Sequence, residues 1–172
     1  QTDFEKNRHS RNIICKSRQL GITTYETIDM LDDTLFVPNL DSLLIAQDKD
    51  TAEDIFTNKI ELAWKNLLEG VRNLYKVDTS NTRQFRFILG DGGESSITVD
   101  ASGRAQTYSR VHITEFAQVC AKYPLKAKEI LEGTIPAVPR NGRIDIESTA
   151  EGENSYFHDM FWEAWERGEP TH

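Results

Sequence analysis

The sequence predicts an α/β domain: a central, mostly parallel sheet flanked by helices, with one antiparallel β-hairpin inserted. Short apolar runs alternate along the chain with longer stretches in which apolar residues recur at helical spacing. Continuous apolar runs are typical of parallel strands that are covered on both faces. Two alternating runs flank a Gly- and Asp-rich turn at 90–93, which indicates the hairpin. The 172 residues suffice for one domain that buries roughly 70% of its unfolded surface.

Each element follows from its local pattern. We expect buried strands at 12–15, 41–46, 110–113 and 143–147, and the hairpin strands at 85–89 and 96–99. We expect helices at 23–35, from 50 to about 68, from about 115, at 124–131 and at 154–167. In the first helix Ile28, Leu31 and Leu35 share one face, and Asp50-Thr51 supplies an N-terminal cap for the second.

Composition excludes several classes of protein. Twenty Lys and Arg face 28 Asp and Glu, for a net charge of −8. This acidic balance argues against a protein that simply coats nucleic acid, although a local basic groove remains compatible with it. The two cysteines, Cys15 and Cys120, form neither a disulfide scaffold nor a zinc motif. No stretch resembles a signal peptide or a membrane span, so we expect a cytoplasmic chain.

The segment Lys16–Thr24 follows a predicted strand and opens a predicted helix, which is the context of a P-loop. Gly21 and Thr23 match the second Gly and the Ser/Thr of G-x-x-x-x-G-K-[ST], whereas Lys16 stands at the first Gly and Ile22 at the Lys. Backbone N–H groups at the helix start can hold phosphate oxygens, and Lys16 can reach back across them. Taken alone, the segment also fits a polar turn with a helix cap at Thr23.

Two further strand ends carry polar side chains. The strand 110–113 is followed by Thr114 and Glu115, as in a Walker B strand whose last carboxylate orients the attacking water. Thr114 occupies the place of the Asp that usually holds magnesium. Ser148 and Thr149 end another strand, where small hydroxyls could sense the γ-phosphate. Alone, these features fit a carboxylate at a helix start and ordinary turn chemistry equally well.

Taken together, in order and spacing, the three segments resemble the N-terminal ATPase domain of phage terminase large subunits, the motors that package DNA into procapsids. The family P-loop often reads K-x-R-Q-x-G-x-[ST]-[ST], its Walker B strand h-H-I-[DST]-E-x-A, and its coupling motif S-T-A-x-G. These patterns match 16–24, 112–117 and, in part, 148–152. The resemblance covers nearly the whole chain, and it implies a P-loop NTPase of the ASCE type over residues 1–172.

The resemblance implies roles for individual residues. Lys16 would contact the β- and γ-phosphates. Thr23 and Glu115 would hold magnesium, and Glu115 would also be the catalytic carboxylate. Arg104 would be the finger that acts on a neighbouring subunit's ATP, with Arg110 as its rival, and Gln1 is a candidate for reading adenine. The nucleotide-binding set as a whole is Lys16, Ser17, Arg18, Gln19, Leu20, Gly21, Ile22, Thr23, Thr24, Ser148 and Thr149.

The implied function is Mg²⁺-dependent ATP hydrolysis that powers translocation of double-stranded viral DNA. The implied partners are this DNA, a portal protein, a small terminase subunit and, in an active ring, further copies of the chain; the isolated domain would be monomeric, without a membrane partner. The implied location is the cytoplasm of the phage or prophage host. We also expect that a C-terminal nuclease domain of the family is absent from these 172 residues.

Two alternatives stay open. Asp145 and Glu147 lie two residues apart on one predicted strand, so they share a face and could hold the metal of a DNA nuclease. Ile22 and Thr114 break both consensus patterns, which favours a nucleotide-binding module that does not hydrolyse ATP.

Overall fold

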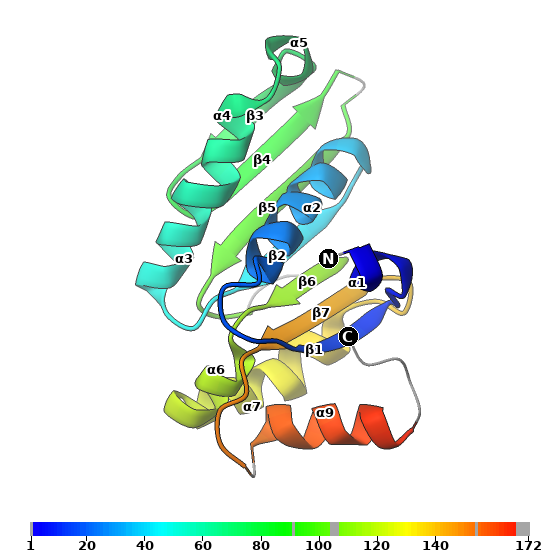
Figure 1. Cartoon of the computed structure of the whole chain (residues 1–172). Coiled ribbons are helices and arrows are strands. Elements are labelled where there is room, and N and C mark those ends of the chain that lie inside the picture. The colour runs from blue at the N-terminus through cyan, green and yellow to red at the C-terminus, as the bar shows by residue number, and fades with distance from the viewer. Residues whose placement is uncertain (1, 91, 104–106, 154, 168–172) are drawn as a thin grey trace.

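A computed structural model describes residues 2–90, 92–103, 107–153 and 155–167. Its centre is an open seven-stranded sheet with the order β1-β7-β6-β2-β5-β4-β3 (Figure 1). The strands from β1 to β5 in that order run parallel, whereas β4 is antiparallel to both of its neighbours. The strands are β1 (Arg11–Cys15), β2 (Asp41–Ile45), β3 (Tyr75–Ser80), β4 (Gln84–Leu89), β5 (Glu94–Asp100), β6 (Arg110–Ile113) and β7 (Arg143–Ser148).

Helices cover both faces of this sheet (Figure 1). One face carries α2 (Ile22–Phe36), α3 (Lys49–Ile55), the π-helical segment η1 (Phe56–Glu61) and α4 (Leu62–Asn66). The other face carries α6 (Phe116–Lys122), α7 (Pro124–Glu129), η2 (Ile130–Thr134) and α9 (Tyr156–Glu166). The remaining helices are short: α1 (Thr2–Lys6), α5 (Glu69–Arg72) and α8 (Ile135–Ala137).

The core divides into two layers because side chains alternate along each strand. On β2, Leu43 and Ile45 pack with the α6 and α7 side, whereas Leu44 packs with α2 and η1. The side chains of Phe85 and Phe87 extend the second layer along β4 toward Trp64. Both layers are continuous and apolar, so hydrophobic burial on the two faces holds the sheet between its helices.

The predicted fold class is confirmed, with differences in detail. The hairpin exists as β4–β5, and its second strand pairs in parallel with β2, so the hairpin extends the main sheet. The strand β3 is an addition to the predicted elements, because Tyr75–Ser80 contains only two apolar residues, Tyr75 and Val77. The predicted helix from 50 to 68 forms as three consecutive segments with π geometry at Phe56–Glu61.

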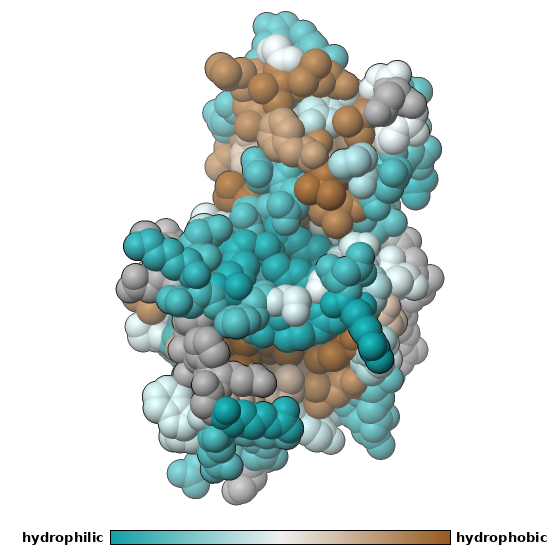
Figure 2. Space-filling view, turned by 90° about the vertical axis from the view of Figure 1, so that its right-hand side faces the viewer, coloured by the Kyte–Doolittle hydropathy of each residue, from teal (hydrophilic) through white to brown (hydrophobic). Residues whose placement is uncertain are grey.

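Figure 2 shows the side of the molecule that faces right in Figure 1, with hydrophilic residues across its middle and hydrophobic residues gathered above them. Phe36 and Val37 at the end of α2, and Leu68 and Leu74 around α5, are exposed apolar residues. Among the described residues, no helix combines the length and the apolar character needed to cross a membrane.

Candidate nucleotide site

The carboxyl ends of β1, β7 and β6 lie side by side, and the three predicted motifs follow these ends. Ligands of open α/β sheets bind at this edge, because the loops there leave parallel strands together. The sheet order therefore brings Lys16, Ser148 and Glu115 to one place although they are separated by up to 132 residues in sequence.

The loop between β1 and α2 turns sharply just before the helix begins. Its chain enters the left-handed region at Gln19, with φ 61°, and again at Gly21, with φ 73°. Gly21 directly precedes α2 and adopts this conformation without a Cβ clash. The dipole and leading N–H groups of this 15-residue helix favour an anion here.

Ile22 occupies the position of the usual P-loop Lys, and its side chain is buried with Phe4 and Ile14. A Lys at this position would place an unpaired ammonium in an apolar cluster, which is costly. The predicted nucleotide contact of Ile22 is therefore limited to its backbone, and the cation must come from elsewhere in the loop.

Lys16 supplies that cation from the first loop position. Its Nζ lies 2.8 Å from Glu115 Oε1 and 3.0 Å from Glu147 Oε2, and only 7% of its side chain is exposed. Its backbone N–H donates to Ser148 O, which continues the β1–β7 pairing by one residue. The side chain thus points across the ends of β7 and β6, toward the predicted catalytic carboxylate.

Glu115 sits in a strained backbone conformation. It follows β6 and precedes α6, with φ 52° and ψ 42°, in the left-handed region that non-glycine residues seldom occupy. Such strain costs on the order of 1 kcal/mol and concentrates at functional sites. Its Oε2 accepts hydrogen bonds from Thr149 Oγ1 at 3.3 Å and Thr149 N at 3.5 Å. Thr149 therefore orients the carboxylate that the Walker B pattern singles out.

Ser148 is fully buried, and its Oγ accepts a hydrogen bond from Ala117 N at 3.1 Å. This contact ties the end of β7 to the first turn of α6. Ser148 and Thr149 together link β7 to α6 and to Glu115.

Thr23 does not cap α2, whose N-cap is Gly21. Its Oγ1 instead donates to Glu147 Oε1 at 2.6 Å, and Thr114 Oγ1 donates to the same oxygen at 2.5 Å. The interpretation of Thr23 as a helix cap is therefore wrong. The structure joins the two hydroxyls expected near magnesium through Glu147, which sequence reasoning did not place in this site.

A signal for this arrangement is present in the sequence. Polar residues occur at every second position along β6 and β7. They are Arg110 and His112 on β6, with Thr114 directly after it, and Arg143, Asp145 and Glu147 on β7. With period-2 alternation these side chains share one face, and the pairing of Ile113 with Ile146 sets them opposite one another. Both rows lie beneath α2, so one stripe of polar side chains leads to the loop.

Lys59 is a second cation beside the loop. It lies in η1, and its Nζ donates to Thr24 Oγ1 at 2.9 Å. Burial lowers the pKa of Lys59, opposed by Asp54 and reinforced by Lys16. Helix segments with π geometry often occur at functional sites. The predicted phosphate contact of Thr24 is thus accompanied by an ammonium that no motif indicated.

A pocket of about 300 Å³ opens over these groups. This volume is at the lower end for small-molecule sites. Its lining includes Lys16, Arg18, Gln19, Thr114, Glu115 and Thr149. The side chains of Ser17, Arg18, Gln19 and Leu20 in the loop are exposed. Five of the predicted site residues, Lys16, Arg18, Gln19, Glu115 and Thr149, therefore line one hollow.

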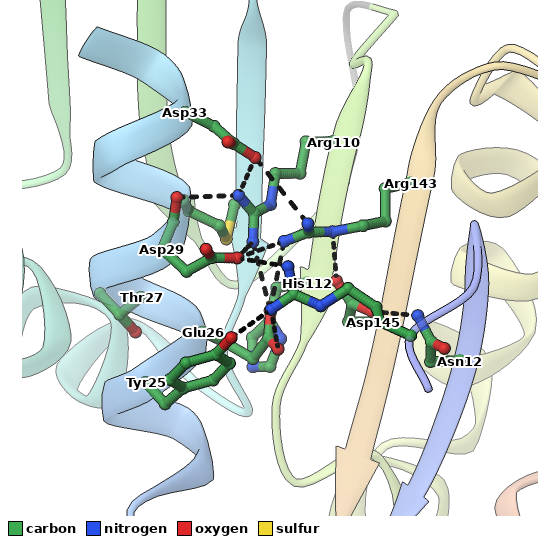
Figure 3. Close-up of polar contacts among 12 residues, drawn as sticks. Asn12, Tyr25, Glu26, Thr27, Asp29, Asp33, Arg110, His112, Arg143 and Asp145 are labelled. Carbon is green, nitrogen blue, oxygen red and sulfur yellow. Dashed lines mark hydrogen bonds and ion pairs between the residues drawn. The ribbon is translucent and has the colours of Figure 1, made fainter. Parts of the chain in front are cut away.

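Arg110 does not meet the requirements of a trans-acting finger. It is 2% exposed and forms ion pairs with Glu26, Asp29 and Asp33 of α2 (Figure 3). A side chain enclosed in this way cannot reach a neighbouring subunit, so Arg110 is excluded as the rival of Arg104. Arg104 and Gln1 lie outside the described residues.

The two carboxylates of the nuclease alternative belong to different networks. Asp145 accepts from Asn12 Nδ2 at 2.6 Å and Arg143 Nε at 2.9 Å (Figure 3), whereas Glu147 faces the loop. Within the part of the chain that the structure describes, no group of three or more His, Cys, Asp or Glu could hold a metal ion. Because Asp145 is held by Asn12 and Arg143 while Glu147 is held by Thr23 of the loop, the two carboxylates do not form the shared metal site of the nuclease alternative.

Known structures match this fold, although no protein-family model and no curated protein matches the sequence. The large terminase ATPase domain of Thermus phage P74-26 has a TM-score of 0.69 at 20% identity, covering 93% of this chain and 67% of that one. The HK97 bacteriophage large terminase has a TM-score of 0.71 at 16% identity, covering 96% and 35%. The large terminase of a thermophilic bacteriophage, in complex with ADP, has a TM-score of 0.55 at 11% identity, covering 94% and 39%.

At these identities the similarity establishes the fold. The chain has the fold of large terminase ATPase domains, a P-loop NTPase fold, and the predicted resemblance is confirmed at that level. The chain spans little more than a third of the HK97 terminase and of the terminase in complex with ADP.

Proposed function

We propose that this chain is a Mg²⁺-dependent ATPase that powers translocation of double-stranded viral DNA into a procapsid. The observation that carries the proposal is the contact between Lys16 Nζ and Glu115 Oε1, at 2.8 Å. It lies beside the loop that leads into α2. These are the cation and the carboxylate that ATP hydrolysis requires, and each comes from the strand end that a P-loop ATPase fold assigns to it.

The side chains have separable roles in this proposal. The loop N–H groups and Lys16 hold the phosphates, so that the γ-phosphate lies near Glu115. Glu115 accepts a hydrogen bond from the attacking water and orients it, while Thr149 fixes the carboxylate. Lys16 pairs with Glu115 and Glu147, and phosphate oxygens would replace these carboxylate oxygens as its partners when nucleotide binds.

The donor set suits magnesium. Mg²⁺ prefers oxygen ligands and keeps several waters, and hydroxyl and carboxylate oxygens of Thr23, Thr114, Glu115 and Glu147 meet at this edge of the sheet. When bound, the ion would neutralise charge that develops on the phosphates. Thr23 and Glu115 are the proposed holders.

The biological setting is part of the same proposal. The matched structures are large terminases, and one of them is a complex with ADP. Support for nucleotide binding by this chain thus comes from fold and site together. The proposed partners are double-stranded DNA, a portal protein, a small terminase subunit and further copies of the chain in a ring, in the host cytoplasm. A net charge of −8 is compatible with DNA translocation, because local basic side chains can make the contact.

The test separates nucleotide binding from hydrolysis. We expect Lys16→Ala to weaken ATP binding, and Glu115→Gln to retain binding but lower phosphate release at least 100-fold. Release is measured with DNA and procapsids present, because a finger acting in trans requires neighbouring subunits. Lys128→Ala and Glu132→Gln are matched controls on an exposed pair of α7 and η2.

Wild-type hydrolysis by both site variants would overturn the proposal. Tight binding of ATP by the wild type without phosphate release, under the same conditions, would favour the non-hydrolysing module instead. The non-hydrolysing module is tested as a second function because Ile22 and Thr114 differ from the consensus residues of the P-loop and of the Walker B strand.

A further inference from the structure

Glu147 is the one site carboxylate to which no motif assigns a role, and it is fully buried. It lies near the carboxyl end of β7, between the loop that follows β1 and the end of β6. Two hydroxyl donors and one ammonium surround it: Thr23 Oγ1 at 2.6 Å, Thr114 Oγ1 at 2.5 Å and, in an ion pair, Lys16 Nζ at 3.0 Å. A buried carboxylate is costly, so its presence among these three groups calls for a role in the site.

The hydrogen bonding around Glu147 is incomplete. Both hydroxyls donate to Oε1, while Oε2 has no hydrogen-bond partner among the described residues and only the ammonium of Lys16 beside it. Below it lies His112, whose Nε2 is 3.6 Å from Oε1 and whose two ring nitrogens also lack partners there. Burial, followed by Lys16 and Lys59, lowers the pKa of His112 to about 3, so the ring is neutral. An oxygen with spare acceptor capacity therefore points to where Lys16 now lies.

Glu147 lies next to the position at which the Walker B strand lacks its usual acidic residue. A P-loop NTPase holds magnesium with the loop Ser/Thr and with an acidic residue on the Walker B strand. Here the loop residue is Thr23, but the acidic position is Thr114, which is uncharged. Thr114 follows Ile113, and Ile113 pairs with Ile146, so Thr114 and Glu147 are neighbours across two parallel strands about 4.8 Å apart. A longer side chain from β7 can cover that distance.

We infer that Glu147 supplies, from the neighbouring strand, the carboxylate that positions magnesium in place of the missing Walker B aspartate. The inference rests on the proposed function. Thr114 is then a positioning residue, because its hydroxyl holds Glu147 Oε1 and leaves Oε2 directed at the site. Lys16 balances the charge of Glu147, and a bound magnesium ion would supply that balance if Lys16 contacted phosphates instead.

The experiment measures how strongly magnesium enhances ADP binding, which does not depend on turnover. Affinity of the whole chain for fluorescent ADP is measured by anisotropy with Mg²⁺ and with EDTA. The enhancement is the ratio of ADP affinity in Mg²⁺ to ADP affinity in EDTA. We expect Glu147→Gln to reduce this ratio at least tenfold, while the affinity in EDTA changes less than threefold. The double variant Thr114→Asp/Glu147→Gln moves the carboxylate to the conventional strand, and we expect it to recover the enhancement.

Asp145→Asn is the matched control, since Asp145 is a buried carboxylate on the same strand and face but binds Asn12 and Arg143. We expect it to keep the full enhancement. If circular dichroism shows that Glu147→Gln does not fold, Glu147→Asp replaces it. Aspartate keeps the negative charge on a side chain that is one methylene shorter. We then expect this variant to lose at least threefold of the enhancement, and the double variant to remain the test of rescue.

The outcomes separate the inference from the proposed function. Full enhancement in Glu147→Gln, or in Glu147→Asp if that is the folded variant, overturns the inference while ADP binding by the wild type upholds nucleotide binding. Enhancement lost in the single variant and regained in the double variant supports the inference. No ADP binding by the wild type overturns both.

Discussion

The buried ionic cluster beneath α2 makes the stability of the domain depend on pH. Three guanidinium groups, of Arg8, Arg110 and Arg143, meet four carboxyl groups, of Glu26, Asp29, Asp33 and Asp145. Figure 3 labels all of these residues except Arg8. One proton on the cluster balances its charge. Burial first, and Asp145 second, raises the pKa of the fully enclosed Glu26 to about 8, and burial also raises the pKa of Asp145. The two carboxyls therefore share that proton near neutral pH.

The direction of the effect follows from the protons bound in each state. Between pH 4.5 and about 8 the folded chain holds a proton that the unfolded chain has released. The free energy of unfolding therefore falls as pH rises, by up to about 1.4 kcal/mol per pH unit. The contribution of Glu26 is complete below pH 4.5 and is lost above about pH 8.

His112 acts in the opposite sense. Its pKa is about 3 in the folded chain against 6.5 in the unfolded one, so stability falls as pH drops from 6.5 toward 3. Between pH 4.5 and 6.5 the two slopes oppose each other, and we expect a plateau there. From pH 6.5 to 8 only the slope of Glu26 remains, which lowers the free energy of unfolding by about 2 kcal/mol.

Urea denaturation at pH 5.5, 6.5 and 8.5, followed by circular dichroism, measures this profile. We expect Glu26→Gln, which mimics the protonated carboxyl, to abolish the loss above pH 6.5, so that its stability relative to the wild type rises by about 2 kcal/mol between pH 6.5 and pH 8.5. Glu132→Gln, an exposed control, leaves the slope unchanged. Equal slopes in Glu26→Gln and the wild type would refute the proton-sharing argument.

Three further substitutions probe the architecture of the site. Arg110→Met removes one of three guanidinium groups and leaves Arg8 and Arg143 to balance the four carboxyl groups of the cluster, so we expect a loss of about 3–5 kcal/mol in urea denaturation; wild-type stability would contradict a structural role for this arginine. Gly142→Ala places a Cβ 2.6 Å from the backbone oxygen of Ser109, and we expect it to cost about 1–3 kcal/mol; an unchanged melting temperature would show that the turn yields. Lys59→Met removes the ammonium beside Thr24, and we expect several-fold weaker ATP binding in a fluorescence titration at unchanged melting temperature. Unaltered affinity would exclude Lys59 from the phosphate site.

The alternation of apolar runs with helical patterns was sufficient to predict the sheet, its two helical layers and the hairpin. These features depend on the local periodicity of apolar residues, which can be read from short stretches of the sequence. The strand β3 was not predicted because Tyr75–Ser80 is mostly polar. It lies at the edge of the described sheet and pairs with β4, so few of its residues need to be apolar. The motifs likewise located Lys16 and Glu115 at strand ends, and the structure brings these two side chains together.

By itself, the sequence determined the fold class and which loops lie at the site, because strand patterns and loop motifs are local. Only the tertiary structure decided which side chains meet. Arg110 and Glu147 occupy alternate polar positions of two adjacent strands, yet one is locked under α2 and the other faces the loop. That difference arises from the parallel register of β6 and β7 and from the path of α2 across them, which join residues more than 30 positions apart. A one-dimensional pattern can show that a carboxylate is missing at Thr114, but it cannot show that the neighbouring strand provides one.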